Sequence, residues 1–363
     1  MLESPALETA GAGTASDAFV ERTLQIVNDA ALALMLSIGH RTRLFDVMAT
    51  RPGWSAGDLA EAAGLNERYV REWLAALVTG AIVEFDGPTQ RYSLPPDRAA
   101  CLTRAASPNN LAVSMQWIAV LGTAEDAVVE AFSHGRGVPY SAYPRFHEVM
   151  AEESQQTVVQ ALTPHILPLV PDLVDRLTTG IGALDIACGS GRAVLALARS
   201  FPRSHFTGID WSAEAIAAAE EEAARLGLAN ARFIRGDAAE LTAVNQYELV
   251  TAFDAIHDQA RPALVLERIH DALRPGGVLL MQDILGHTHL ADNLAHPLGP
   301  FLYTISCLHC MSVSLAAGGP GLGAMWGRER ASAMLREAGF EDVRVDTLPH
   351  DPLNYYYVAA KGR

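Results

Sequence analysis

The sequence is poor in cysteine, in basic charge and in long apolar runs, and each shortage excludes a class of protein. Its four cysteines over 363 residues are typical of a reducing compartment. Cys307 and Cys310 form a lone CxxC without a second pair, so we do not expect a structural zinc knot. Basic side chains number 27 against 42 acidic ones, a net charge of −15. Because an acidic surface repels phosphate, we expect no nucleic-acid partner.

Membrane and export signals are also missing from the pattern. The apolar stretches AALALMLSI and FLYTISCLHCMSVSLAA fall short of a membrane span, and the second contains a histidine. The first residues, MLESPALETAGAGTASD, carry acids where a signal peptide needs basic residues and an apolar core. We therefore expect a cytoplasmic protein with no membrane partner. Hydrophobic residues make up 50% of the chain, which is ample for buried cores.

The first part, residues 1–105, predicts a mainly α winged-helix domain. Ser55 with Asp58 three residues later is a helix-capping signature, Gly64 stops that helix, and Asn66 caps the next one. Two short strands, AIVEF and RYSL, are joined by DGPTQ, a turn sequence. Helix, turn, helix and hairpin in this order are typical of a winged helix.

The second of these helices lacks the basic stripe of a DNA-reading helix. Its arginines, Arg68 and Arg71, are offset by Glu67 and Glu72. Its other face has residues suited to burial: Tyr69, Trp73, Leu74 and Leu77. A structural or dimerisation module is favoured over a ligand-sensing transcriptional regulator.

Residues 106–180 predict a helical linker that lines a pocket, interrupted by SHGRGVPYSAY with its Tyr140 and Tyr143. From 181 to 363 short apolar runs alternate with helices. ALDIA, HFTGID, ARFIRGD, YELVTAFDAI and GVLLMQDI read as strands, and two more follow near the C-terminus as an edge hairpin. This alternation predicts an α/β domain with a mostly parallel sheet covered on both faces.

The loop after the first of these strands, LDIACGSGRA, is built for a ligand. Gly189 and Gly191 permit a tight turn and a close approach to the helix N-terminus. Asp210 ends the next strand, where an acid can bind both hydroxyls of a ribose, and Asp237 ends the third, placed to accept from an adenine amino group. The third glycine of a nicotinamide fingerprint is missing.

As a set, these motifs resemble the class I S-adenosylmethionine (SAM) dependent methyltransferases, which have a Rossmann-like fold. The first motif of that family appears as Asp185, Ala187, Gly189 and Gly191, and LRPGGVLL at 273–280 matches the turn before its fifth strand. The resemblance implies a SAM cofactor held by Asp185, Cys188, Gly189, Gly191, Asp210, Trp211, Gly236, Asp237, Ala238 and Phe253. The winged helix in front is similar to that of small-molecule O-methyltransferases, which implies a homodimer and a reversed last strand.

The stretch VTAFDAIHDQA carries the candidate chemistry in His257 and Asp258. In the O-methyltransferases, a segment like LHDW follows the fourth strand, and its histidine is the general base. The resemblance thus implies His257 as base for a hydroxyl, and a neutral imidazole suits that task near pH 7.

A second histidine supports a different reading. With His309 in ISCLHCMS, the set resembles the metal-dependent 2-oxo acid C-methyltransferases of peptide-antibiotic biosynthesis. That resemblance implies one metal ion, zinc or non-haem iron, bound by His257, Asp258 and His309. The implied reaction is methylation at C3 of a 2-oxo acid such as 4-methyl-2-oxopentanoate or phenylpyruvate.

Carbon methylation would need more than an imidazole. A carbon beside a ketone holds its proton tightly, and each pKa unit to be overcome costs about 1.4 kcal/mol. A metal chelated by the 2-oxo acid would stabilise the enolate as a Lewis acid. Tyr143 or a bound water is a candidate for the base. The metal-free O-methyltransferase with His257 as base stays open as the alternative.

Overall fold

The computed structural model describes residues 15–363, so the N-terminal stretch weighed against a signal peptide lies mostly outside the described residues. The chain divides into two compact units, one ending at Ala119 and the other running from Val120 to Arg363. This division falls inside the segment 106–180, which was expected to be a helical linker.

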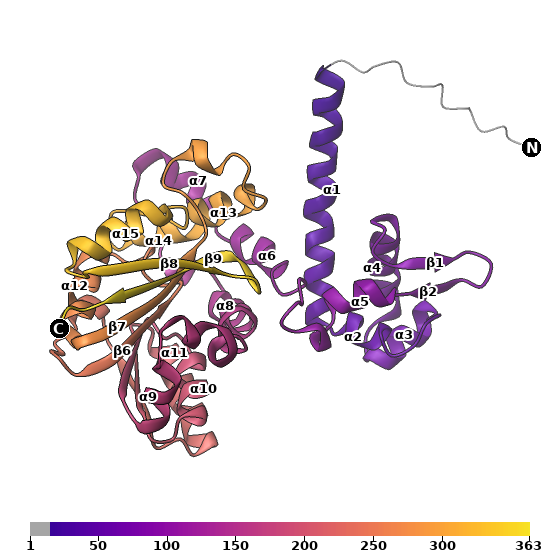
Figure 1. Cartoon of the computed structure of the whole chain (residues 1–363). Coiled ribbons are helices and arrows are strands. Elements are labelled where there is room, and N and C mark those ends of the chain that lie inside the picture. Colours follow the sequence, from indigo (N-terminus) through magenta and orange to yellow (C-terminus); the bar gives the residue numbers. More distant parts are fainter. Residues whose placement is uncertain (1–14) are drawn as a thin grey trace, which may run out of the picture. The chain divides into compact units, whose positions relative to one another are not determined.

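The first unit contains the expected helices and hairpin (Figure 1). Its elements are α1 (Ala15–Arg41), α2 (Leu44–Met48), α3 (Ala56–Ala63), α4 (Glu67–Thr79), β1 (Glu84–Asp86), β2 (Arg91–Ser93), α5 (Pro96–Leu102) and η1 (Arg104–Ala106), and α6 (Gln116–Gly122) crosses the division. The Ser55 hydroxyl accepts from the Asp58 amide and the Asn66 side chain from the Arg68 amide, so both predicted caps are confirmed.

Helix α4 buries one face and balances charge on the other. Val70, Trp73, Leu74 and Leu77 are buried, whereas Tyr69 is 81% exposed. The expectation that Tyr69 is buried was wrong, because Val70 completes the i, i+3, i+4, i+7 stripe in its place. On the polar face, Arg68 pairs with Glu72 and Arg71 with Glu67.

The second unit is built on a seven-stranded sheet in the order β5-β4-β3-β6-β7-β9-β8. The strands β3 (Gly182–Ile186), β4 (His205–Asp210), β5 (Ala231–Arg235), β6 (Tyr247–Phe253) and β7 (Leu273–Ile284) are parallel. The strands β8 (Asp342–Leu348) and β9 (Asp351–Ala360) form an antiparallel hairpin at the edge. The predicted mostly parallel sheet with a reversed final strand is confirmed.

Helices cover both faces of this sheet (Figure 1). One face packs on α12 (Pro262–Ala272) and α15 (Gly327–Glu337). The other packs on α9 (Leu173–Thr179), α10 (Arg192–Ser200), α11 (Ala213–Leu226) and the segment 155–169. Because both faces are buried, the central strands are almost continuously apolar, and a polar side chain on them is conspicuous.

Two irregular helical runs complete the unit. The first comprises α7 (Glu125–His134), η2 (Tyr140–Ala142), α8 (Phe146–Ser154), the π-helices η3 (Gln155–Val159) and η4 (Leu162–Ile166), and η5 (Leu167–Leu169). The second comprises η7 (Leu290–Asn293), α13 (Gly299–Ile305), the π-helix η8 (Ser306–Cys310) and α14 (Met311–Ala316). The short 3-10 helix η6 (Ala238–Glu240) follows β5.

The run Gly299–Ala316 is, among the described residues, the one helical stretch long and apolar enough to cross a membrane by length and composition alone. Within this unit Leu302, Cys310 and Val313 are buried, so part of its apolar surface is used inside the domain. The cytoplasmic location stays a prediction.

Candidate active site

The loop after β3 adopts the backbone that its glycines predict. Ala187, Gly189 and Gly191 all have positive φ, of 52°, 53° and 72°. A Cβ added at Gly191 would lie 2.4 Å from the ring of Phe233, so this position needs glycine for space as well as for its backbone angle. Gly191 then caps α10, which leaves the helix N-terminus open toward the loop.

Asp210 ties this loop to the next strand. One of its carboxylate oxygens accepts from the Gly189 amide at 2.9 Å, and the other from the Ser212 amide at 2.8 Å. Each oxygen has a second lone pair, so the hydroxyls of a ribose could still bind there. Trp211 follows with 58% of its surface exposed, beside the loop where a flat ligand group could pack.

Asp185 and Cys188 sit on the buried side of the loop. The Thr251 hydroxyl donates to Asp185 at 2.6 Å, while burial raises the pKa of Asp185 to about 7. Burial also raises the pKa of the Cys188 thiol above its ordinary value. The thiol therefore stays protonated and does not act as a nucleophile.

Asp237 lies where the sequence placed it, but it has a partner that sequence reasoning missed. Its Oδ1 accepts from the Ala239 amide at 2.8 Å, and its Oδ2 accepts from Arg261 at 2.7 Å. Arg261 also contacts Glu240 at 2.7 Å. No pattern around ARPALV in the sequence signals this clamp, which forms because β5 and β6 end at the same edge of the sheet.

The strand register brings the predicted cofactor residues together. Ile186 of β3 pairs with Ile209 of β4 and with Ala252 of β6, and Asp210 pairs with Arg235 of β5. The loop, Asp210, the Gly236–Asp237–Ala238 turn and Phe253 therefore share the carboxyl edge of the sheet. This edge is where open α/β sheets bind their ligands.

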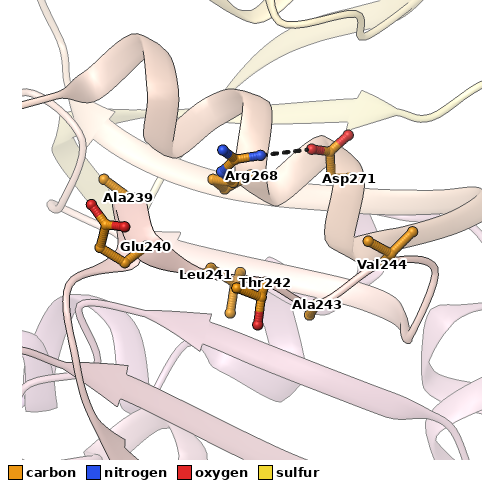
Figure 2. A pocket seen from close by; sticks show the side chains of 8 residues that line it. All are labelled: Ala239, Glu240, Leu241, Thr242, Ala243, Val244, Arg268 and Asp271. Atoms are coloured by element: carbon orange, nitrogen blue, oxygen red, sulfur yellow. Dashed lines mark hydrogen bonds and ion pairs between the residues drawn. The ribbon is translucent and has the colours of Figure 1, made fainter.

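A pocket of about 290 Å³ lies between η6, the segment that follows it and α12 (Figure 2). Its lining residues are not those of the predicted cofactor site. It contains the Arg268–Asp271 ion pair, 3.3 Å between charged atoms, and is lined by Ala239, Glu240, Leu241, Thr242, Ala243 and Val244. None of the predicted catalytic side chains reaches it, so we do not treat it as the active site.

His257 is buried and firmly oriented. Its Nδ1 lies 2.8 Å from Oδ1 of Asp283, which also accepts from the indole N–H of Trp326 at 2.9 Å. Burial lowers the pKa of His257, but the carboxylate of Asp283 and the Cys310 thiol outweigh it, and the pKa is raised well above its ordinary value. Sequence reasoning missed Asp283 and Trp326. The signal for Asp283 was a carboxylate at the end of the buried strand GVLLMQDI.

His309 lies near His257 but makes no hydrogen bond. Its ring stacks on Phe146 at a centroid distance of 3.8 Å, and Tyr140 and Tyr143 approach it edge-on, each at 4.8 Å. Neither ring nitrogen has a partner. Burial, and then the positive charge of nearby His257, lower the pKa of His309 to about 3. The imidazole is therefore neutral at physiological pH.

Asp258 connects these groups to the cofactor edge. Burial raises its pKa to about 6, the charge of His257 lowers it, and Asp283 and Asp210 raise it. His257 and Asp210 therefore both lie near enough to Asp258 to affect its pKa. His257 also lowers the pKa of His309, which follows 52 positions later in the chain, so these two histidines lie near each other.

The three side chains do not fit a metal ion in this arrangement. Among residues 15–363, no group of three His, Cys, Asp or Glu side chains is placed to hold one. The ring of His309 is packed among Phe146, Tyr140 and Tyr143, and neither of its nitrogens has a partner. The expected metal site is therefore not supported.

Tyr143, the candidate base for a carbon acid, is committed elsewhere. Its hydroxyl donates to the carbonyl of Leu308, and burial raises its pKa to about 12. The segment around it is pinned to α14, since the Val138 amide donates to the Ser312 hydroxyl at 2.8 Å and a Cβ at Gly137 would lie 1.7 Å from the Ser312 carbonyl. The irregular segment SHGRGVPYSAY is thus held against α14 and, through Tyr143, against η8, and its place beside a pocket stays a prediction.

The same two units are found in known proteins. Residues 30–104 match the family described as the Rv2258c-like winged HTH domain, and residues 177–313 match a methyltransferase domain family. A trans-aconitate 2-methyltransferase of Deinococcus radiodurans is 33% identical over 111 residues, which are 31% of this chain and 41% of the relative. The chain thus spans less than half the length of that relative.

Solved structures extend the likeness to the whole chain. A Nostoc punctiforme protein described as a candidate O-methyltransferase has a TM-score of 0.72 at 21% identity, covering 96% of this chain and all of that one (100%). Human N-acetylserotonin methyltransferase in complex with SAM has a TM-score of 0.70 at 17% identity, covering 98% and 100%. The chain therefore has the fold of the SAM-dependent methyltransferases, with a methyltransferase domain behind an Rv2258c-like winged-helix domain.

Proposed function

We propose that the protein transfers a methyl group from SAM to a hydroxyl of a small molecule, with His257 as the general base. The observation that carries this proposal is the His257–Asp283 hydrogen bond of 2.8 Å at the cofactor edge of the sheet. The structural neighbours include O-methyltransferases, which supports the same reading.

In this reaction Asp283 would orient His257, and His257 would accept the proton. Asp283, held by the Trp326 indole and the Ile284 amide, fixes the imidazole with its Nδ1–H toward the carboxylate. In that tautomer Nε2 of His257 carries no proton, so it can take the proton of the hydroxyl. When bound, SAM would supply an electrophilic methyl whose bond to sulfur breaks as the acceptor oxygen attacks, with S-adenosylhomocysteine leaving, while His257 takes the hydroxyl proton. The raised pKa makes His257 a stronger base but lowers the fraction of it that is neutral near pH 7.

The aromatic side chains that surround His309 suit a flat acceptor. Tyr140 stacks on His147 with ring centroids 5.4 Å apart and meets Trp211 edge-on at 6.0 Å. With Phe146 and His309, these rings form an aromatic lining beside the cofactor edge. Aromatic rings offer large contact area and stack on planar ligands, so we propose a small aromatic hydroxy compound as the acceptor.

C3-methylation of a 2-oxo acid is the second candidate, and one observation favours it. The nitrogens of His309 lack any partner although the ring is 1% exposed, and buried polar atoms normally have one. An acceptor or an ion bound there would satisfy them. Because the described residues are not arranged for a metal, we place this reaction second.

One experiment separates the candidates. Purified protein is dialysed against a chelator, its metal content is measured, and it is incubated with SAM and either hydroxylated aromatics or 2-oxo acids. We expect methyl ethers without added metal. In the same assay His309→Phe, which keeps the stacking on Phe146, should retain activity to within roughly 10-fold. Methylated 2-oxo acids that form only after metal is restored would replace the first candidate with the second.

A further inference from the structure

One carboxylate at the cofactor edge, Asp254, has no role in the reaction described above and has an unusual setting. It follows the last residue of β6 with a positive φ of 50°, a backbone angle that costs a non-glycine residue energy and that clusters at functional sites. Its amide donates to the Gln282 carbonyl on β7 at 3.0 Å, which fixes its position.

Two side-chain oxygens at this place accept no hydrogen bond. Oδ1 of Asp254 is shielded from solvent without a hydrogen bond, and so is Oε1 of Gln282, a residue with 0% exposure. Asp351 beside them shows the contrast, because it accepts from Gln282, Asn354 and the Tyr356 hydroxyl. Unsatisfied acceptors of this kind call for a ligand that donates N–H groups.

The surrounding charge is negative as well. Burial raises the pKa of Asp254 well above its ordinary value, and the neighbouring Asp283, Asp351 and Glu153 raise it further, with His257 as the opposing charge. Because one oxygen of this half-buried carboxylate is shielded from solvent without a donor, a cationic donor would be bound strongly at this place.

The strand order selects which part of the cofactor reaches Asp254. Ile186 pairs with Ala252, so Asp254 lies level with Cys188 in the loop after β3. The adenine and ribose positions, Asp237 and Asp210, lie on β5 and β4, on the other side of β3. An extended cofactor therefore directs its amino-acid end toward β6.

We propose that Asp254, assisted by Gln282, receives the ammonium group at the amino-acid end of SAM. This inference rests on the proposed function, since it takes SAM as the ligand. The ammonium provides three N–H donors and a positive charge, whereas the sulfonium has charge but no donor and the carboxylate would be repelled.

The test is a thermodynamic cycle in which the residue at position 254 and the amino group of the ligand are removed separately and together. Calorimetry compares binding of S-adenosylhomocysteine (SAH), which keeps the amino group, with its deaminated analogue, on wild type, Asp254→Asn and Asp254→Gly. Both variants accept a positive φ and should fold. We expect wild type to favour SAH by roughly 10- to 100-fold, as for a charge-assisted hydrogen bond. That preference should shrink to about 3-fold or less in both variants, while Glu153→Gln, a nearby carboxylate outside the contact, should keep it.

The outcomes are distinct. An undiminished preference in both Asp254 variants would overturn the assignment while leaving the methyltransferase proposal intact. The same holds if Glu153→Gln alone abolishes the preference. Failure of wild type to bind SAH at all would overturn both proposals.

Discussion

Nδ1 of His257 lies 2.8 Å from Oδ1 of Asp283, although 26 residues separate them. The contact joins the loop after β6 to the end of the neighbouring strand β7, and it is sealed from solvent, with exposures of 4% and 0% for the two side chains. Because the pair is buried and the carboxylate is held by further donors, the imidazole has one tautomer and one orientation.

Replacing the carboxylate should therefore impair catalysis more than binding. In Asp283→Asn the amide can present either a donor or an acceptor to the ring, so the productive tautomer is no longer enforced. We expect kcat to fall roughly 10²- to 10³-fold with SAH affinity nearly unchanged, within the range for a positioned general base. Trp326→Phe, which removes only one donor to Asp283, should cost less than about 10-fold. Equal activity of Asp283→Asn and wild type would remove His257 from the role of base.

The pH dependence of kcat/KM tests the same pair independently. The base acts in its neutral form, and Asp283 and Cys310 raise the pKa of His257 above the usual 6.5 despite its burial. Activity should therefore increase with pH along a limb whose midpoint lies well above 6.5. In Asp283→Asn the main stabiliser of the imidazolium is lost while burial persists, so the midpoint should move below the ordinary value. A limb that does not move would contradict the assignment.

The cofactor loop allows a matched comparison of two glycines. Both have positive φ, but a Cβ at Gly191 meets Phe233 at 2.4 Å, whereas at Gly189 it meets nothing within 4 Å. Gly189→Ala should cost about 1 kcal/mol of backbone strain. Gly191→Ala adds overpacking, so we expect a loss of about 2–4 kcal/mol. Thermal unfolding without cofactor measures the loss of stability in both variants. Equal losses would contradict the prediction and would mean that the Phe233 ring shifts to make room for the added methyl group.

A homodimer remains a prediction, and helix α1 offers the surface to test. An exposed apolar stripe follows alternating four- and three-residue steps along it, typical of helix pairing: Val20, Leu24, Val27, Ala31, Leu34 and Ile38. We expect Leu24→Glu with Val27→Glu to give monomers in light scattering after size exclusion. Ala18→Glu with Gln25→Glu, on the opposite face of the helix, should leave dimers. A wild-type monomer would end the prediction.

The local features were readable because local chemistry decides them. The caps at Ser55 and Asn66, the turn at Gly189 and Gly191, and the alternation of strands and helices depend on residues within a few positions of each other. Tyr69 shows the limit of this reasoning, because an amphipathic stripe fits two neighbouring registers and packing chose Val70.

The sequence by itself determined the parallel sheet, the cofactor loop and the residues that gather at its edge, because periodicity and glycine geometry are local properties. That His257, Asp258 and His309 form one site stays a prediction, drawn from a family resemblance. Only the tertiary structure decided what each of them contacts. Asp283 and Trp326 reach His257, and Phe146 reaches His309, from distant parts of the chain. Such contacts depend on strand order and helix packing, which no spacing within one segment encodes.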